Sequence, residues 1–237
     1  MNRIIVKNLS KTFYIAEQLQ NTFIEKLMFK VKTRAINIFK DVTFSVKEGE
    51  FFGIIGRNGA GKSTLLKIVA GIYDQDGGIV KIKGSFAPFL ELGVGFHPEL
   101  TARENAILNG IILGLSRKYI LGRIDKIFEF AELTGFEDVR LKNFSSGMRS
   151  RLAFSIAFEA DVDIYLLDEV FAVGDIWFQK KCITKLIDLK KRGKTVVVVS
   201  HSMEFIESFC DRAALLDKGK ILEIGEPKKV IRRYINL

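Results

Sequence analysis

Residues 51–64 read FFGIIGRNGAGKST, and this stretch decides the fold. The apolar run over residues 51–55 predicts a strand that is buried on both faces of a parallel sheet. The residues that follow match the pattern GxxxxGK[ST], and residues 62–70 then predict a helix. In a strand–loop–helix unit of this kind, the backbone amides of the loop and the helix N-terminus face one concavity. The stretch therefore predicts a loop that binds the phosphates of a nucleoside triphosphate.

Each residue type in this loop has a chemical reason. Lys62 is long enough to reach the β- and γ-phosphates, and the Ser63 hydroxyl is a ligand for Mg²⁺. The alternative is a glycine-rich turn that binds nothing, and the strand, the spacing and the Lys-Ser pair together disfavour it. The loop alone does not separate ATPases, GTPases and kinases. The candidate nucleotide-binding residues are Gly56, Arg57, Asn58, Gly59, Ala60, Gly61, Lys62, Ser63 and Thr64.

Strands and helices alternate along the rest of the chain, which predicts an α/β fold with a mainly parallel core sheet. Early and late strands predict an antiparallel addition, and residues 213–216 and 220–224 are expected to form a hairpin around Lys218 and Gly219. Further strands are expected at residues 4–6, 42–46, 79–82, 164–167 and 196–199, and helices at residues 102–134, 148–160 and 177–192.

Residues 16–34 differ in composition from their surroundings. Apolar residues recur there at helical spacing, from Leu19 through Phe23 and Leu27 to Val31, and lysines flank the stripe. The pattern predicts an amphipathic helix. Such a helix either contacts a partner or a membrane interface, or packs on its own domain.

Composition limits the class of protein. Among 237 residues, 37 Lys and Arg against 28 Asp and Glu give a net charge of +9, and 48% of residues are hydrophobic. This content excludes a disordered chain, while the charge suits a nucleotide, a nucleic acid or an anionic membrane surface. The two cysteines are too few for a disulfide scaffold and indicate a reducing compartment. No apolar run reaches the roughly 18 residues of a membrane span, so a peripheral contact with a membrane is expected.

An apolar strand that ends in two carboxylates lies at residues 164–169. Beside a phosphate loop, Asp168 is placed to support Mg²⁺, and Glu169 to polarise the attacking water as a general base. The alternative is a solvated pair that caps a strand. His201 follows another apolar strand, on the side where ligands collect in parallel sheets, and can hydrogen-bond the γ-phosphate. The alternative is a surface or core histidine without a catalytic role. The candidate catalytic residues are therefore Lys62, Glu169 and His201, and the candidate Mg²⁺ ligands are Ser63 and Asp168.

Residues 144–148 read FSSGM, and they complete a set of four ordered motifs. With them the chain resembles the nucleotide-binding domain of an ABC (ATP-binding cassette) transporter almost from end to end. The resemblance implies a P-loop NTPase (RecA-like) core with an antiparallel β subdomain and an α-helical signature subdomain. It implies one domain over residues 1–237, with the core and β subdomain at about 1–100 and 161–237, the helical subdomain at about 101–160 and an amphipathic insertion at 16–34.

The resemblance also implies roles for individual residues. The signature residues Ser145, Ser146, Gly147 and Met148 would contact the γ-phosphate bound by the opposite subunit, and an ordinary Ser N-cap is the alternative. The family's usual signature is Leu-Ser-Gly-Gly-Gln, from which Phe144, Ser146 and Met148 depart. Asp175 corresponds to the D-loop aspartate, and Glu91 takes the place of the Q-loop glutamine. Phe13 matches best the aromatic ring that stacks on adenine, with Tyr14 as its neighbour, and a place in the core is the alternative for either ring.

Residues 91–101, ELGVGFHPELT, and 103–105, REN, are similar to the subfamily that exports polysaccharides. The resemblance implies an ATP-hydrolysing homodimer with ATP and Mg²⁺, on the cytoplasmic face of the inner membrane. A transmembrane permease would be its partner and a lipid-linked polysaccharide such as O-antigen its cargo, with no nucleic acid. The alternatives are an ABC ATPase for another substrate, a soluble ABC-type ATPase acting on nucleic acid or ribosomes, and a binding module without turnover.

Overall fold

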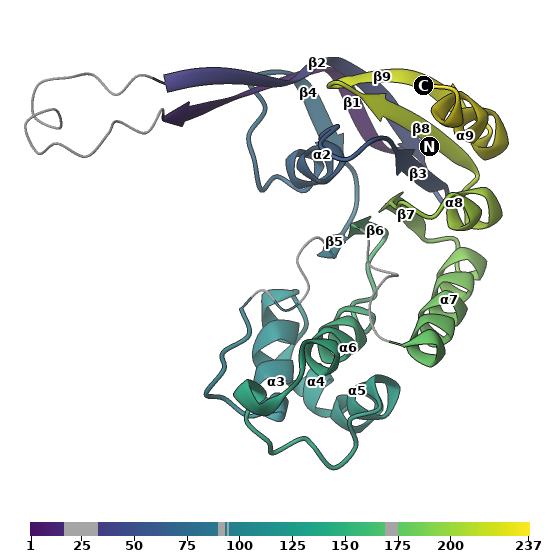
Figure 1. Cartoon of the computed structure of the whole chain (residues 1–237). Coiled ribbons are helices and arrows are strands. Elements are labelled where there is room, and N and C mark those ends of the chain that lie inside the picture. Colours follow the sequence, from purple (N-terminus) through teal and green to yellow (C-terminus); the bar gives the residue numbers. More distant parts are fainter. Residues whose placement is uncertain (17–32, 90–92, 94, 169–174) are drawn as a thin grey trace, which may run out of the picture.

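Two β-sheets occupy the upper and middle parts of the molecule in Figure 1. The computed structural model describes residues 1–16, 33–89, 93, 95–168 and 175–237. In these residues the strands are β1 (Asn2–Ala16), β2 (Thr33–Lys47), β3 (Phe51–Ile55), β4 (Gly77–Ile82), β5 (Phe86–Phe89), β6 (Ile164–Asp168), β7 (Thr195–Val199), β8 (Arg212–Asp217) and β9 (Lys220–Gly225). The helices are α2 (Lys62–Val69), α3 (Ala102–Ile112), α4 (Arg117–Leu121), α5 (Ile124–Ala131), α6 (Ser146–Ala157), α7 (Ile176–Lys191), α8 (Met203–Phe209) and α9 (Pro227–Ile235), with a short 3₁₀ helix at Leu141–Asn143.

The larger sheet has the order β5-β6-β7-β3-β8-β9. Neighbouring strands from β5 to β8 are parallel, and the hairpin partner β9 is antiparallel. In β3, Phe51 and Ile55 face one apolar cluster, whereas Phe52 and Ile54 face the other. A strand with both faces covered needs apolar residues at every position, which explains its continuous apolar sequence. The prediction of an α/β fold with a mainly parallel sheet is confirmed.

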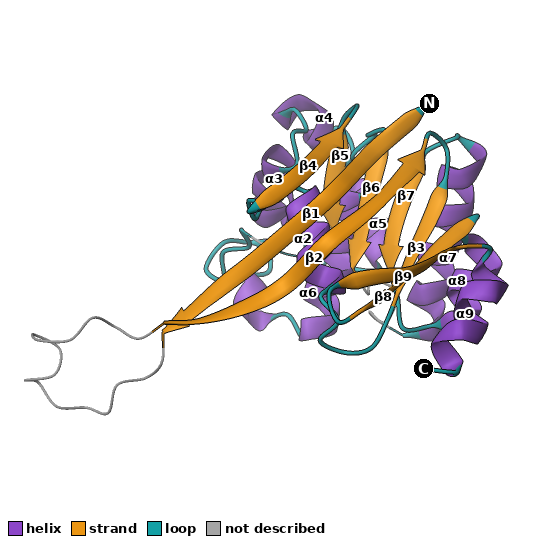
Figure 2. Cartoon of the chain, turned by 90° about the horizontal axis from the view of Figure 1, so that it is seen from above, coloured by secondary structure: helices purple, strands orange, loops and turns teal. Residues whose placement is uncertain are grey.

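The smaller sheet is antiparallel and has the order β2-β1-β4. Figure 2 shows β1 and β2 crossing over the strands of the larger sheet, and the far end of this hairpin projecting away from the body. The predicted strands at residues 4–6 and 42–46 are much too short. Pairing continues to Ala16 and Thr33, because two strands that project together satisfy each other's backbone groups without an alternating apolar pattern.

The predicted helix over residues 16–34 is wrong at its ends. Ala16 belongs to β1, and Thr33 and Arg34 belong to β2. Residues 17–32 lie outside the described residues.

Helices α3 to α6 form the lower part of Figure 1 and enclose their own apolar cluster, which includes Phe128 and Leu152. The predicted continuous helix over residues 102–134 is wrong, because the chain is divided here into α3, α4 and α5. Gly114 takes a φ of 86° after α3, and Ser116 caps α4 by accepting a hydrogen bond from Tyr119 N. A glycine at positive φ ends a helix and a serine cap begins another, so each break has a local cause.

The strand β5 and the helices α8 and α9 were not predicted from the sequence. β5 has four residues and contains Pro88, and α8 has seven residues, so neither gives a clear periodic signal.

Cys182 and Cys210 are buried free thiols, and burial raises the pKa of each to about 12. No helix in the described parts of the chain combines the length and the apolar character that crossing a membrane requires.

Candidate functional site

The loop after β3 is held between β8 and the smaller sheet. An ideal Cβ on Gly56 would lie 2.1 Å from the carbonyl oxygen of Leu216 in β8. Gly61, the N-cap of α2 with a φ of 98°, would place a Cβ 2.9 Å from the ring of Phe39 in β2. Both positions exclude any side chain, and this close approach determines the path of the loop.

The outer side of the loop is open. Gly59 takes a φ of 76°, and an ideal Cβ there would meet nothing within 4 Å. Lys62 is only 6% exposed, and its ammonium group donates to the carbonyl oxygens of Gly56 and Arg57 at 3.0 and 3.1 Å. Ser63 and Thr64 are half-buried in the first turn of α2. An accessible loop that combines a helix N-terminus with an ammonium group suits the phosphates of a nucleotide.

The strand order brings Asp168 to the same edge of the sheet. Val199, the last residue of β7, pairs with Asp168 of β6 on one side and with Ile54 of β3 on the other. The carboxyl ends of β3 and β6 therefore flank that of β7. The Ser63 hydroxyl and the Asp168 carboxylate are oxygen donors of the kind that Mg²⁺ prefers, so the residues present fit this ion. Glu169 lies outside the described residues.

Ser200 and His201 follow β7, between the loop and Asp168. Ser200 is buried, and its hydroxyl oxygen accepts a hydrogen bond from the backbone N–H of Ser202 at 3.0 Å. Ser202 in turn caps α8 by accepting from Phe205 N at 3.2 Å. These two bonds form a tight turn that holds His201 exposed at the edge of the sheet. The structure thus brings together the loop, Asp168 and His201.

Residues 144–148 begin α6 in the helical part, apart from α2 (Figure 1). Ser145 is the N-cap, and its hydroxyl oxygen accepts from Met148 N at 3.2 Å, while Ser145 and Ser146 are both exposed. Phe144 is 3% exposed and lies edge-on to Phe136 at 6.2 Å. The departures at Phe144 and Met148 therefore serve the apolar cluster of the helical part, against which Met148 also packs.

Asp175 is the N-cap of α7, and its carboxylate accepts from Phe178 N at 2.9 Å. It is exposed, so the same side chain remains accessible from outside. Glu91, which is expected at the Q-loop position, lies outside the described residues.

Phe13 and Tyr14 lie on β1. The ring of Phe13 contacts Tyr73 edge-on at 5.5 Å, and the ammonium group of Lys11 lies 5.3 Å from its centroid. Tyr14 is 72% exposed. Tyr73, the residue that contacts the Phe13 ring, was not singled out in the sequence, because it belongs to none of the recognised motifs.

Asn105 is a second residue whose structural role could not be predicted from the sequence. It is fully buried, and its amide nitrogen donates to the carbonyl oxygens of His97, Leu100 and Thr101 at 3.0, 3.2 and 2.9 Å. Its amide oxygen accepts from His97 N at 2.6 Å. One side chain thus shapes the whole turn that precedes α3.

The same turn is joined to the segment that leads to α6. Backbone bonds run from Leu141 N to Leu100 O and from Lys142 N to Pro98 O, both at 2.9 Å. The hydrogen bond from Lys142 lowers the pKa of the exposed Glu99 carboxyl below its usual value. The turn and the residues before Ser145 therefore form one unit.

Residues 39–172 match the family model for ABC transporters. The chain is similar to an O-antigen export system ATP-binding protein of Klebsiella pneumoniae, with 47% identity over 204 residues that make up 86% of this chain and 83% of that protein. An O-antigen export system ATP-binding protein of Myxococcus xanthus is 44% identical over 199 residues, which are 84% of this chain and only 46% of that protein. A teichoic acids export ATP-binding protein of Lactiplantibacillus plantarum is 43% identical over 195 residues, which are 82% of this chain and 53% of that protein.

Solved structures agree with the sequence relatives. The ATP-binding subunit of an ABC transporter superposes with a TM-score of 0.77 at 26% identity, covering 99% of this chain and 93% of that one. A dimeric ATP-binding cassette in a post-hydrolysis state with ADP and Pi gives a TM-score of 0.74 at 26% identity, covering 94% and 98%. The predicted P-loop NTPase fold is confirmed. The chain belongs to the ABC transporter family, as an ATP-binding cassette homologous to the O-antigen and teichoic acid export proteins.

Proposed function

We propose that the chain is the ATP-hydrolysing subunit of an ABC transporter that exports a lipid-linked polysaccharide. The observation that carries the proposal is the arrangement at one sheet edge: the open loop with Lys62, the carboxylate of Asp168 and the turn with His201 come from three strands that lie side by side. In open α/β sheets, ligands bind beyond the carboxyl ends of the strands.

In this proposal the loop amides and Lys62 bind the β- and γ-phosphates of ATP. Ser63 and Asp168 hold Mg²⁺, which when bound neutralises charge on the phosphate oxygens. Glu169 follows Asp168 directly and accepts a proton from the attacking water. His201 donates a hydrogen bond toward the γ-phosphate and keeps the water in line.

We further propose that two copies act head to tail. Ser145 is exposed and begins α6, whose amides form an outward-facing anion site. The loop of the same copy lies in a different part of the molecule (Figure 1). A second copy would therefore supply the signature residues to each ATP. Because ATP would touch both copies, it favours the closed dimer by differential affinity.

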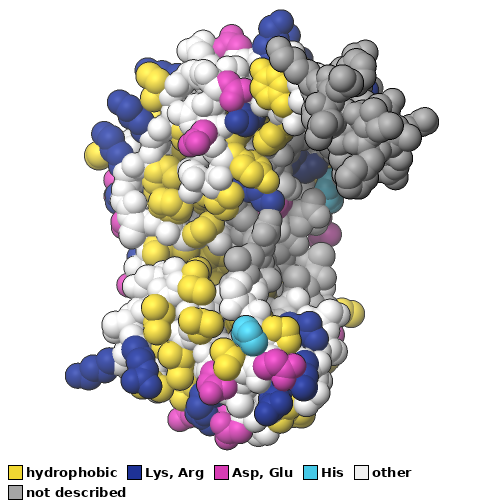
Figure 3. Space-filling model, turned by 90° about the vertical axis from the view of Figure 1, so that its left-hand side faces the viewer, with side chains coloured by type: hydrophobic (Ala, Val, Ile, Leu, Met, Phe, Trp, Pro, Cys, Tyr) yellow, Lys and Arg dark blue, Asp and Glu magenta, His cyan; other side chains and the backbone are white. Residues whose placement is uncertain are grey.

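The transmembrane partner is a permease in this proposal, and the cassette sits peripherally on the cytoplasmic face of the inner membrane. Figure 3 shows hydrophobic side chains gathered along the hollow between the upper and lower parts of the molecule. On the described surface, α3 exposes Leu108, Ile111 and Ile112 by 38%, 45% and 57%. Exposed apolar residues that cluster around a hollow suit a protein partner. The polysaccharide cargo is inferred from the names of the relatives.

The experiment is Glu169→Gln, which keeps the shape of the side chain and removes the base. We expect steady-state phosphate release to fall by about 10²–10⁴-fold, while ATP still converts the protein to a dimer in size-exclusion chromatography. Glu204→Gln, at an exposed position of α8, is the control and should retain both properties. Wild-type turnover by the Glu169→Gln variant would remove Glu169 as the base.

A further inference from the structure

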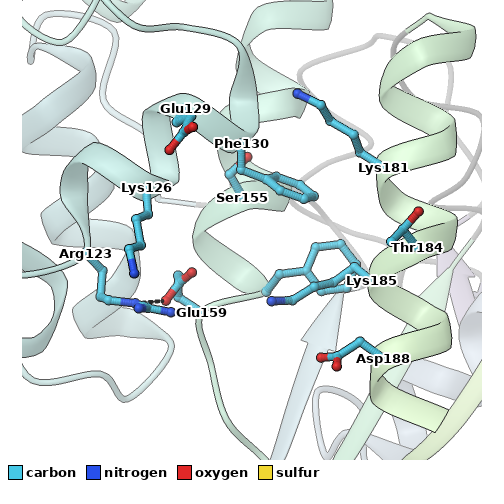
Figure 4. Close-up of a pocket in the computed structure, with 11 residues that line it drawn as sticks. Arg123, Lys126, Glu129, Phe130, Ser155, Glu159, Lys181, Thr184, Lys185 and Asp188 are labelled. Atoms are coloured by element: carbon cyan, nitrogen blue, oxygen red, sulfur yellow. Dashed lines mark hydrogen bonds and ion pairs between the residues drawn. The ribbon is translucent and has the colours of Figure 1, made fainter. Parts of the chain in front are cut away.

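A cavity of about 580 Å³ lies where α5 and α6 of the helical part meet α7 (Figure 4). None of the residues that line it belongs to the phosphate loop, to the turn around His201 or to the signature residues. Its volume is within the range of pockets that hold small molecules. It is therefore separate from the proposed ATP site.

Aromatic rings form the apolar wall of this cavity. Phe130 and Phe158 lie edge-to-face with their centroids 6.2 Å apart, and Phe130 also contacts Phe178 at 5.7 Å. Phe158 is only 6% exposed, whereas Phe130 is half-buried. The packing fixes both rings, so they offer a rigid apolar surface to a ligand.

The acidic side chains at one end of the cavity already have partners. The Glu159 carboxylate accepts a hydrogen bond from Arg123 Nε at 2.6 Å. Asp188 lies 3.7 Å from a terminal nitrogen of Arg192. Arg123 thus balances Glu159, whereas Arg192 is shared between Asp188 and Asp161, with which it makes the shorter contact of 2.6 Å.

Two lysines add positive charge to the same end. Figure 4 shows Lys126 on α5 and Lys185 on α7 reaching toward the region of Glu159 from opposite walls. Within the described part of the chain, neither lysine makes an ion pair. Lys181, at the other end of the cavity, forms an ion pair with Glu132, with 2.7 Å between its ammonium nitrogen and a carboxylate oxygen. Glu129, the remaining carboxylate of the lining, lies at the end of Lys181 in Figure 4. The end around Glu159 therefore offers two ammonium groups to an anion, beside an aromatic wall.

We infer that this cavity binds a small organic phosphate, with its phosphate between Lys126 and Lys185 and its apolar part against Phe130 and Phe158. Two ammonium groups on opposite walls match a doubly charged phosphate monoester, with which they form charge-assisted hydrogen bonds. A ligand held this way contacts α5 of the helical part and α7 of the core at once, and so joins the two parts.

The test uses phenyl phosphate as the probe and the whole chain with saturating MgADP, which occupies the phosphate loop. Ligand-observed NMR titration measures the dissociation constant. We expect saturable binding to the wild type, and binding weaker by about tenfold or more in the Lys126→Gln/Lys185→Gln double variant. Lys118→Gln/Lys191→Gln, which changes exposed lysines of α4 and α7 outside the cavity, is the matched control and should bind as the wild type does.

Inorganic phosphate forms the second arm of the test. It lacks the ring, so we expect it to bind more weakly than phenyl phosphate. Equal affinity for the two probes would contradict the role of Phe130 and Phe158. The absence of saturable phenyl phosphate binding to the wild type, or equal binding by the lysine double variant, would overturn the site.

Discussion

The glycines of the phosphate loop have different physical reasons at different positions. Gly56 is fixed by the carbonyl oxygen of Leu216, which leaves no room for a Cβ. Gly59 faces open space and is needed only for its backbone, with φ at 76°. The loop shape thus depends on close packing at its start and on backbone freedom in its middle.

This difference predicts unequal stabilities for two alanine variants. Gly56→Ala forces a Cβ against the carbonyl oxygen of Leu216, at a φ of 157° that side chains rarely adopt, and should lower the free energy of unfolding by about 3 kcal/mol or more. Gly59→Ala, the matched control, meets only the left-handed backbone penalty of about 1–2 kcal/mol. Urea unfolding of the nucleotide-free proteins measures both values. A Gly56→Ala variant as stable as Gly59→Ala would contradict the packing argument.

At the scale of elements, the start of α3 organises the region before the signature residues. Thr101 and Glu104 form a reciprocal capping box there, with Thr101 N bonded to the Glu104 carboxylate at 2.8 Å. Asn105 fixes the preceding turn, and this turn pairs with residues 140–142. The helix start and the approach to α6 therefore depend on one another.

Removing the Asn105 amide should weaken this unit. Asn105→Ala removes the hydrogen bonds of a fully buried amide and takes from His97 N the acceptor that lies at 2.6 Å, so we expect a loss of about 1–3 kcal/mol in the free energy of unfolding. Asn143→Ala, at an exposed position nearby, should stay within about 0.5 kcal/mol of the wild type. Denaturant titration checks both, and equal stability of the two variants would refute the role given to Asn105.

The elements that could be predicted from the sequence are those whose environment imposes a pattern. The strands β3, β6 and β7 are covered on both faces, so their apolar runs are continuous and their positions were predicted correctly. The projecting ends of β1 and β2 are not covered in this way, and their pairing left no pattern to find. The breaks between α3, α4 and α5 depend on single glycine and serine positions within an otherwise helical pattern.

The residues of the candidate site could likewise be predicted only where a sequence pattern marks them. Lys62 and Asp168 could be placed at one edge, because the carboxyl ends of parallel strands meet there. Tyr73 and Asn105 could not be assigned, because their contacts bring together residues that no motif connects. Long-range packing of this kind appears only in the folded chain.

At the scale of the whole molecule, the groups proposed to bind ATP are divided between two parts. The loop and Asp168 belong to the core, and Ser145 is exposed at the start of α6 in the helical part. In the proposed dimer, each ATP is bound by the loop and Asp168 of one copy and by the signature residues of the other copy. A dimer of one copy with a defective loop and one copy with a defective signature should therefore keep one intact ATP site.

The most direct measurement is ATPase activity in a mixture of two inactive variants, Lys62→Ala and Ser145→Arg. A mixed dimer holds one intact site, made of the Ser145→Arg copy's loop and the Lys62→Ala copy's signature residues, so the mixture should hydrolyse ATP well above the sum of the separate proteins. Mixing Ser145→Arg with the Lys62→Ala/Ser145→Arg double variant is the control and should stay inactive. A mixture no more active than its components would contradict the shared site.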